Sequence, residues 1–412
     1  MNKAIEEKIN TLLSRSIDTI YPSKDALKKI LLSNKKISVY VGIDPTADYV
    51  HIGHSTNYII LKRFHELGHK VIVLVGDFTA MIGDPSDKTS MRIQLSEEQV
   101  EANLKTFKSQ IGKILPLDDG QNPIEFVHNS KWLSKLSFND AVELASNFTV
   151  QQMLERDAFK KRISDNKPLH LHEFFYPLMQ GYDSVAMKVD IEVGGTDQTF
   201  NMLAGRTLEK RYLNKEKFVI TTTLLENPVT GEKLMSKSLG TGVGLNDSPE
   251  EMYGKIMALP DEGILQCFVD CTYLLLSEVD KIAHDLKSGK NPRDIKKKLA
   301  LEIVTMYHDV KKAHAAEENW TKQFSTRDKN YVPTNTTKLA RKSFITQATR
   351  DTQRAALIAA CATAIPQSMS EANRLFKQGG LRLNGNTITD ASTLPEVGDI
   401  LQIGKKHYFK IV

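Results

Sequence analysis

The segment "YVGIDPTADYVHIGH" (residues 40–54) places His51 and His54 three residues apart, with Gly53 between them, directly after an apolar stretch. If a strand ends at Asp44 and a helix begins near His51, both imidazoles lie at a helix N-terminus, where free N–H groups and the positive dipole end suit a phosphate. Side chains at i and i+3 face the same way and can donate hydrogen bonds to it, and a glycine leaves room for a flat base. Alone, this spacing also fits two surface histidines or half of a metal site.

A second polar motif, "KLMSKSLG" (residues 233–240), places Lys237 between two serines in a glycine-flanked loop. A flexible lysine beside hydroxyl groups can neutralise the charge that develops on a triphosphate in the transition state. A solvated surface loop is the ordinary alternative for an isolated Lys-Ser pair. The two motifs together, in this order, are more specific for nucleotide chemistry than either one alone.

The elements that would position these motifs form an alternating α/β pattern. Residues 36–44 and 70–78 have the apolar patterns of buried strands, and residues 52–67 between them have the pattern of a helix. Such a strand–helix–strand unit gives parallel strands with a right-handed crossover. A further buried strand is predicted at 124–129, and the α/β rhythm continues to about residue 240. We therefore predict a doubly wound, Rossmann-like parallel sheet, which binds ligands at the carboxyl edge of its strands.

Changes in sequence pattern divide the chain into four parts. Residues 1–245 would form the α/β domain, and residues 246–325 have the patterns of an α-helical domain. Residues 326–344 are polar without an apolar period and are predicted to form a linker. Residues 345–412 combine helix signals with short β segments and turn dipeptides, which predicts a small α+β domain.

The composition is that of an ordinary water-soluble protein: of 412 residues, 41% are hydrophobic and 25% are charged, with a net charge of +5. No long apolar run occurs, so we expect no membrane span, and the charge-interleaved N-terminus does not resemble a secretory signal. Cys267, Cys271 and Cys361 form neither a disulfide framework nor a full metal-ligand set, which indicates reduced core thiols and a cytoplasmic location. Residues 345–412 hold eight Lys and Arg against five Asp and Glu, which weakly favours a polyanionic partner.

The two motifs resemble the paired signatures of class I aminoacyl-tRNA synthetases, and the residues between them resemble the tyrosyl members of that family, through essentially the whole chain. The resemblance implies a ligase that activates L-tyrosine with ATP to tyrosyl-adenylate and then transfers tyrosine to the 3′-terminal ribose of tRNA(Tyr). The residues it implies for catalysis are Thr46, His51, His54, Lys88, Arg92 and Lys237. Those it implies for ATP binding are Asp44, His51, Gly53, His54, Gly195, Asp197, Met235, Ser236, Lys237 and Ser238.

The segment "YPLMQGYDSV" (residues 176–185) carries the features expected of an amino-acid pocket. Tyr176, Gln180 and Asp183 recur at i, i+4 and i+7, so they share one face of a helix, and a buried polar cluster needs a polar ligand. The resemblance assigns Asp183 and Tyr40 to the hydroxyl group of tyrosine, so that phenylalanine would leave the carboxylate unpaired. The full set of implied tyrosine contacts is Tyr40, Gly42, Asp84, Tyr176, Gln180, Asp183 and Gln198.

The resemblance also implies partners. ATP would act as a substrate together with Mg²⁺, with no prosthetic group and no dedicated metal site, since the sequence shows no carboxylate cage. The C-terminal part resembles an S4-type RNA-binding domain, the helical domain would face the anticodon, and residues from about 125 to 190 would furnish a homodimer interface. The residues implied to meet RNA phosphates are Arg374, Lys377, Arg382, Lys405 and Lys406.

Two positions depart from the family pattern. Leu234 stands where the Lys-Met-Ser-Lys-Ser signature has its first lysine, and Lys233 lies one residue early. Glu192 occupies a position where many tyrosyl enzymes have glutamine. The sequence leaves open whether Lys233 compensates and what Glu192 does.

Three alternatives are a tryptophanyl synthetase, another nucleotidyltransferase and a non-catalytic RNA-binding descendant. Asp183 and Tyr40 suit a hydroxyl group better than an indole N–H, which argues against the first. The "MSKS" loop and the RNA-binding tail argue against the second. The intact His51, His54 and Lys237 argue against a loss of catalysis.

Overall fold

The computed structural model describes residues 3–33, 35–85, 95–235 and 242–325, and further along the chain residues 336–337, 374, 378–388, 398–404 and 407–411. The chain divides into two compact units, Met1–Glu317 and Glu318–Val412. Among the described residues, no helix is both long and apolar enough to cross a membrane.

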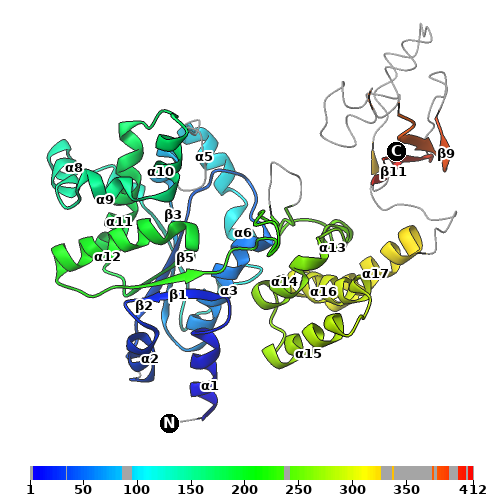
Figure 1. Ribbon diagram of the computed structural model, residues 1–412, viewed down its shortest axis with the longest axis horizontal. Coiled ribbons are helices and arrows are strands. Elements are labelled where there is room, and N and C mark those ends of the chain that lie inside the picture. The colour runs from blue at the N-terminus through cyan, green and yellow to red at the C-terminus, as the bar shows by residue number, and fades with distance from the viewer. Residues whose placement is uncertain are drawn as a thin grey trace, which may run out of the picture. The chain divides into compact units, whose positions relative to one another are not determined.

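A six-stranded sheet forms the centre of the first unit, in the order β1-β6-β5-β2-β3-β4 (Figure 1). Its strands are β1 (Ile17–Tyr21), β2 (Ser38–Ile43), β3 (Lys70–Val75), β4 (Glu125–His128), β5 (Ile191–Gly195) and β6 (Phe218–Thr222). The last five run parallel, and β1 is antiparallel to β6. This confirms the predicted doubly wound α/β fold. The strand order reverses between β2 and β5, which opens a crevice at their carboxyl ends.

Helices cover both faces of this sheet. On one side α3 contacts β2, β3 and β5, and on the other α12 contacts β5 and β6 while α11 packs against α12 (Figure 1). The helices around the sheet are α1 (Lys3–Leu12), α2 (Lys24–Leu32), α3 (Ile52–Glu66), α4 (Asp77–Ile82), α5 (Glu97–Leu104), α6 (Phe107–Ile111), α11 (Phe175–Met187), η2 (Thr196–Gln198) and α12 (Thr199–Leu213).

Short helices fill the segment between β4 and α11. They are α7 (Ser130–Leu133), α8 (Phe138–Ala145), α9 (Val150–Leu154), α10 (Asp157–Ser164) and η1 (Leu171–Phe174). Three begin with a Ser, Thr or His capping box, as at Ser137 and Thr149, which satisfies the free N–H groups of the first turn. A buried ion pair between Arg162 and Glu173 ties α10 to η1.

Helices dominate residues 249–325, as predicted. They are α13 (Pro249–Met257), η3 (Asp261–Gly263), α14 (Ile264–Cys271), α15 (Leu276–Lys287), α16 (Pro292–Tyr307), α17 (Val310–Trp320) and a π-helical turn, η4 (Thr321–Ser325). Cys267 and Cys271 are buried free thiols on α14, as expected, and Cys361 lies outside the described residues.

Arg15 joins the α/β part to these helices. Its buried guanidinium donates hydrogen bonds to the carbonyl oxygens of Phe268, Val269 and Thr272 at 2.8–2.9 Å, and to that of Leu274. These carbonyls lie around the C-terminal end of α14, where a cation also complements the helix dipole.

The second unit contains a five-stranded sheet in the order β7-β11-β10-β8-β9. Its strands are β7 (Thr336–Thr337), β8 (Leu381–Leu383), β9 (Asn386–Thr387), β10 (Ile400–Ile403) and β11 (His407–Ile411). The predicted turn at Asn384-Gly385 joins β8 to β9, and both residues have positive φ, as a tight hairpin turn requires. The predicted linker at 326–344 lies outside the described residues apart from β7.

Two strand predictions were wrong in part. The strand predicted at 70–78 ends at Val75, because Asp77 begins the short helix α4. The strand predicted as buried at 124–129 is only partly buried. It is the outermost strand of the sheet and pairs with β3 alone, so its apolar residues are covered on fewer sides.

Candidate active site

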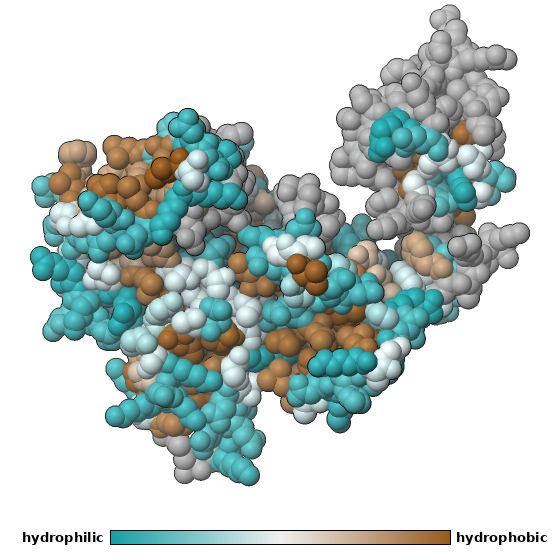
Figure 2. Space-filling view, in the orientation of Figure 1, coloured by the Kyte–Doolittle hydropathy of each residue, from teal (hydrophilic) through white to brown (hydrophobic). Residues whose placement is uncertain are grey.

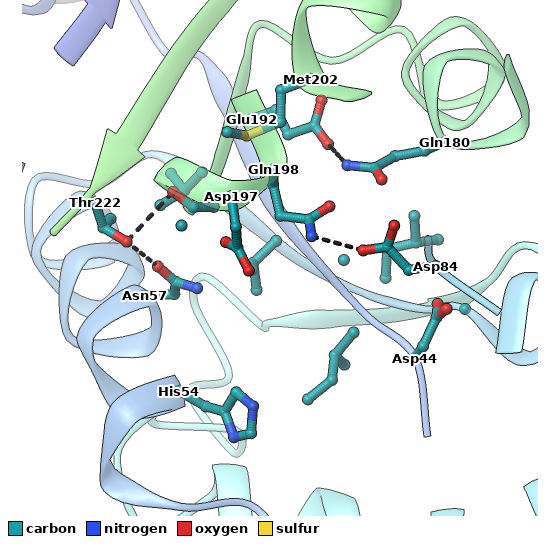
Figure 3. A pocket seen from close by; sticks show the side chains of 18 of the residues that line it. Asp44, His54, Asn57, Asp84, Gln180, Glu192, Asp197, Gln198, Met202 and Thr222 are labelled. Carbon is teal, nitrogen blue, oxygen red and sulfur yellow. Dashed lines mark hydrogen bonds between the residues drawn. The ribbon is translucent and has the colours of Figure 1, made fainter. Parts of the chain in front are cut away.

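A cavity of about 320 Å³ opens at the carboxyl ends of β2 and β5, where the strand order reverses (Figure 3). It brings together fifteen predicted residues from segments far apart in the sequence: Tyr40, Gly42, Asp44, Thr46, His51, Gly53, His54, Asp84, Tyr176, Gln180, Asp183, Gly195, Asp197, Gln198 and Met235. Lys88, Arg92, Ser236, Lys237 and Ser238, also predicted for the site, lie outside the described residues.

The two histidines of the first motif lie at the N-terminus of α3, as predicted. Their rings stack with centroids 3.7 Å apart and planes 19° apart. The His51 backbone N–H donates to Nδ1 of His54 at 3.3 Å, which leaves the His54 proton on Nε2. Burial lowers the pKa of His51 to about 4 and that of His54 well below its ordinary value, so both rings are neutral at pH 7. Each neutral ring still offers one N–H donor.

Gly53 lets the histidine rings approach the first turn of α3. A Cβ atom at this position would lie 3.0 Å from two ring atoms of His51 and 3.5 Å from the Cβ of Met235. The structure therefore gives a packing reason for the glycine, and contact with adenine remains a prediction.

The buried Asp183 carboxyl group lines the cavity. The Trp132 indole N–H donates to one of its oxygens at 2.7 Å, and the Asn129 amide donates to the other at 3.3 Å. Burial raises the pKa of Asp183 well above its ordinary value, and these two hydrogen bonds oppose that shift. Beside it, the buried Tyr40 hydroxyl is 2.8 Å from the Ser184 hydroxyl.

The other predicted pocket residues form two polar groups. Tyr176 donates to Asp44 at 2.8 Å, and Asp44 also accepts from Thr79 at 2.7 Å. Asp84 accepts from the Gln198 amide at 2.7 Å, as Figure 3 shows.

Glu192, whose role the sequence left open, lines the cavity and accepts a hydrogen bond from the Gln180 amide at 3.0 Å (Figure 3). Its second oxygen pairs with the ammonium group of Lys217, a fully buried residue just before β6. A carboxylate in a buried pocket is costly unless it is paired, so Lys217 explains how the chain tolerates a charge here.

The structure also explains the second departure from the family pattern, Leu234 in the motif of residues 233–240. Leu234 is buried, whereas Lys233 lines the cavity with its Nζ 4.0 Å from an Asp197 oxygen. The leucine therefore belongs to the core, and the lysine one residue earlier brings positive charge to the site.

Sequence reasoning missed several residues that shape this site. Trp132 and Asn129 fix Asp183, Lys217 pairs with Glu192, and Arg156 approaches Asp84 to 3.5 Å. Of these missed residues, only Lys217 could have been anticipated from the sequence. An unexplained carboxylate at Glu192 in a buried pocket needs a buried cation as its partner. Over the part of the chain that the structure describes, no cluster of three or more His, Cys, Asp or Glu could hold a metal ion.

Comparisons with known proteins place the chain in a family. A sequence model described as "tRNA synthetases class I (W and Y)" matches residues 32–325. The chain is 42% identical over 406 residues to a tyrosine–tRNA ligase of Moorella thermoacetica, covering 97% of this chain and 94% of the relative. It is 40% identical over 407 residues to that of Haemophilus influenzae, covering 98% and 97%. The chain belongs to the tyrosine–tRNA ligase family. The predicted resemblance is therefore confirmed.

Solved structures of the family share this fold. The tyrosyl-tRNA synthetase of Archaeoglobus fulgidus, solved with L-tyrosine, superposes with a TM-score of 0.59 at 24% identity and covers 75% of this chain and 99% of its own. The shared fold therefore extends over about three quarters of this chain. In such a fold, a nucleotide-binding crevice beside a polar amino-acid pocket can hold the two substrates next to each other.

Proposed function

We infer that this protein is a tyrosine–tRNA ligase, which activates L-tyrosine with ATP and transfers it to tRNA(Tyr). The observation that carries this inference is the buried end of the cavity, where Asp183 and Tyr40 offer an acceptor and a hydroxyl group to one ligand atom. A phenolic hydroxyl both donates and accepts, so it matches this pair, while an indole N–H only donates.

At the opposite end, Asp84, Tyr176 and Gln180 are suited to the ammonium group of tyrosine. All three line the cavity and carry oxygen atoms that accept hydrogen bonds. We propose that Gly42 and Gln198, which also line it, complete the tyrosine contacts.

The tyrosine carboxylate is ionised at neutral pH and attacks the α-phosphorus of ATP without a general base. The protein then positions the two substrates and stabilises the negative charge on pyrophosphate as it leaves. Thr46 and the neutral His51 and His54 donate hydrogen bonds, and Lys233 adds positive charge beside Asp197, which we assign to ATP binding. We assign further charge to Lys88, Arg92 and Lys237. Mg²⁺ enters bound to the ATP phosphates, which its preference for phosphate oxygens favours.

We place the remaining ATP contacts directly after β2, at the N-terminus of α3 and at the carboxyl end of β5. Asp44, Gly53, Gly195 and Asp197 line the cavity at these places, and Met235 lines it from the second motif, residues 233–240. The adjoining Ser236 and Ser238 complete the set that we propose.

The proposed domains are residues 1–245 for catalysis, 246–325 for facing the anticodon, 326–344 as a linker and 345–412 as an S4-like RNA-binding domain. Arg382 on β8 is exposed, and Arg374 is exposed while donating to Gln378 at 3.1 Å. With Lys377, Lys405 and Lys406 they would make salt-dependent contacts to RNA phosphates. The reduced buried thiols support a cytoplasmic location.

We propose that residues from about 125 to 190 form a homodimer interface. Apolar side chains gather over α8 and α10 in Figure 2, and Phe138, Val150 and Leu171 in this segment are 85%, 67% and 77% exposed. Large apolar side chains exposed together favour a protein partner. A second copy suits them, since oligomers of one chain are the commonest assemblies.

The test is amino-acid-dependent exchange of pyrophosphate into ATP, with tyrosine, phenylalanine and tryptophan measured side by side. We expect exchange with tyrosine alone, followed by charging of tRNA(Tyr) when the RNA is added. Exchange with tryptophan would contradict the role of Asp183 and Tyr40, and no exchange with any of the three would contradict the ligase function.

A further inference from the structure

Lys217 joins two residues, Ser184 and Glu192, that each bond a different side chain of the amino-acid pocket. It is fully buried, and its three N–H groups are all used. They donate to the Ser184 hydroxyl at 2.7 Å, to Glu192 and to the Met202 carbonyl oxygen at 3.2 Å. Ser184 and Glu192 in turn each bond a pocket residue.

The packing of α12 leaves space for this ammonium group. A Cβ atom at Gly205 would lie 2.4 Å from the Lys217 Nζ and 2.8 Å from the Ser184 Oγ. The network is therefore built into the helix–sheet contact, and a buried charge in such a place is costly unless its hydrogen bonds are complete.

At the hydroxyl end, Lys217 fixes the direction of a hydrogen-bond chain. An ammonium group can only donate, so the Ser184 oxygen accepts from it and the serine proton must go elsewhere. Its remaining partner among the described residues is Tyr40, at 2.8 Å. If Tyr40 donated instead, a buried serine proton would have no acceptor. The Tyr40 oxygen therefore accepts from Ser184, and the Tyr40 proton is directed to Glu192 on the pocket wall or to a ligand hydroxyl that takes its place.

The carboxylates around Tyr40 keep that proton in place. Burial, and then the negative charges of Glu192 and Asp183, raise the pKa of Tyr40 well above its ordinary value. Tyr40 is thus a donor throughout the physiological pH range.

The same lysine sets the direction of a second hydrogen bond. Glu192 accepts from Lys217 with one oxygen and offers its other oxygen as an acceptor. The Gln180 amide must then turn its NH₂ group toward Glu192, at 3.0 Å (Figure 3). The amide oxygen of Gln180 is left as an acceptor for an ammonium group.

We propose that Lys217 is a positioning residue that orients both ends of the tyrosine pocket, making Tyr40 a donor to the ligand hydroxyl through Ser184 and Gln180 an acceptor for the ligand ammonium through Glu192. This rests on the proposed function, because it takes the ligand to be tyrosine.

The experiment measures dissociation constants by calorimetric titration of the full-length protein, without ATP. The three ligands are L-tyrosine, L-phenylalanine, which lacks the hydroxyl, and 3-(4-hydroxyphenyl)propionate, which lacks the ammonium. Ser184→Ala removes only the hydrogen-bond link from Lys217 to Tyr40 and keeps the Lys217–Glu192 pair. The double variant Lys217→Met with Glu192→Gln removes both charges together, so that no buried charge is left unpaired.

We expect Ser184→Ala to weaken tyrosine and the propionate by roughly fivefold each, the size of one net hydrogen bond, and to leave phenylalanine unchanged. The double variant should weaken the binding of phenylalanine and of the propionate by a similar factor each. It should weaken the binding of tyrosine by about the product of these two factors, because tyrosine has both the hydroxyl and the ammonium group. Equal weakening of all three ligands by Ser184→Ala, or wild-type tyrosine affinity in the double variant, would overturn the proposal. If the double variant does not fold, Ser184→Ala decides the link through Ser184 and Glu192→Gln decides the link through Glu192, where an unchanged affinity for phenylalanine would overturn the proposal.

Lys215→Met is the matched control. Lys215 is a neighbouring lysine that donates to the carbonyl oxygens of Lys188 and Val189 and pairs with Asp190 at 3.0 Å, away from the cavity. We expect its three dissociation constants to equal those of the wild type, and the same pattern of losses in this variant would overturn the assignment to Lys217. A wild-type protein that does not bind tyrosine would instead refute the proposed function.

Discussion

We expect Glu209 on α12 to make the stability of this protein depend on pH. Its carboxyl group is fully buried, and neither oxygen accepts a hydrogen bond from any residue that the structure describes. Burial raises its pKa from the ordinary value of 4.5 to about 7, an effect that the positive charges of Lys215 and Lys217 reduce but do not cancel.

The sign of the effect follows from proton linkage. Below about pH 4.5 the carboxyl is protonated in both the folded and the unfolded chain, and it does not affect stability. Between about pH 4.5 and 7 the unfolded chain loses this proton while the folded chain keeps it, so folding becomes less favourable as the pH rises. From the two pKa values, the penalty is about 1 kcal/mol at pH 5 and about 3 kcal/mol at pH 8.

The perturbation is Glu209→Gln, which keeps the shape of the side chain but cannot ionise. We expect the free energy of unfolding of the variant, relative to the wild type, to rise by about 2 kcal/mol between pH 5 and pH 8. Urea unfolding at both pH values measures this difference, and any constant cost of the buried amide cancels.

Glu216→Gln is the control, since Glu216 lies in the connection after the same helix but has a half-exposed side chain paired with Arg206. Its difference from the wild type should stay the same at the two pH values. A Glu209→Gln difference that also stays constant would refute the reasoning that burial keeps this carboxyl protonated.

Three further predictions test other contacts. Trp132→Phe removes the N–H that holds Asp183, so tyrosine should bind roughly tenfold more weakly in equilibrium titration while phenylalanine changes little; equal losses for both ligands would contradict this. Lys233→Met should lower kcat of pyrophosphate exchange by roughly tenfold or more without raising the tyrosine KM, because the charge of Lys233 lies beside Asp197. An unchanged exchange rate would refute a role of Lys233 in stabilising the leaving pyrophosphate. Arg15→Met leaves buried carbonyls unpaired and should lower the free energy of unfolding by about 3 kcal/mol in urea, whereas an unchanged midpoint would show that water replaces the guanidinium.

Local sequence patterns predicted the elements around the site well, because hydrophobic periodicity and capping are short-range features. The strands at β2 and β3 and the helix α3 appear where the patterns indicated, within a few residues. The pattern failed at Asp77, where an apolar run continues from a strand into a helix. It also failed to show that β4 is an edge strand, because strand order depends on pairing with distant segments.

The sequence by itself, together with the family resemblance that its motifs carry, predicted the chemistry of this protein. Two histidines at a helix start and a lysine between two serines favour a nucleotide, and polar residues at helical spacing favour a polar ligand, because residue type fixes which groups can bind. The resemblance adds that this ligand is tyrosine. Only the tertiary structure decided how those groups are supported: Trp132 holds Asp183, Lys217 pairs with Glu192, and Glu209 is buried without a hydrogen-bond partner among the described residues. These relations join residues from different helices and strands. Their distances and burial are set by packing across the sheet, which no local pattern records.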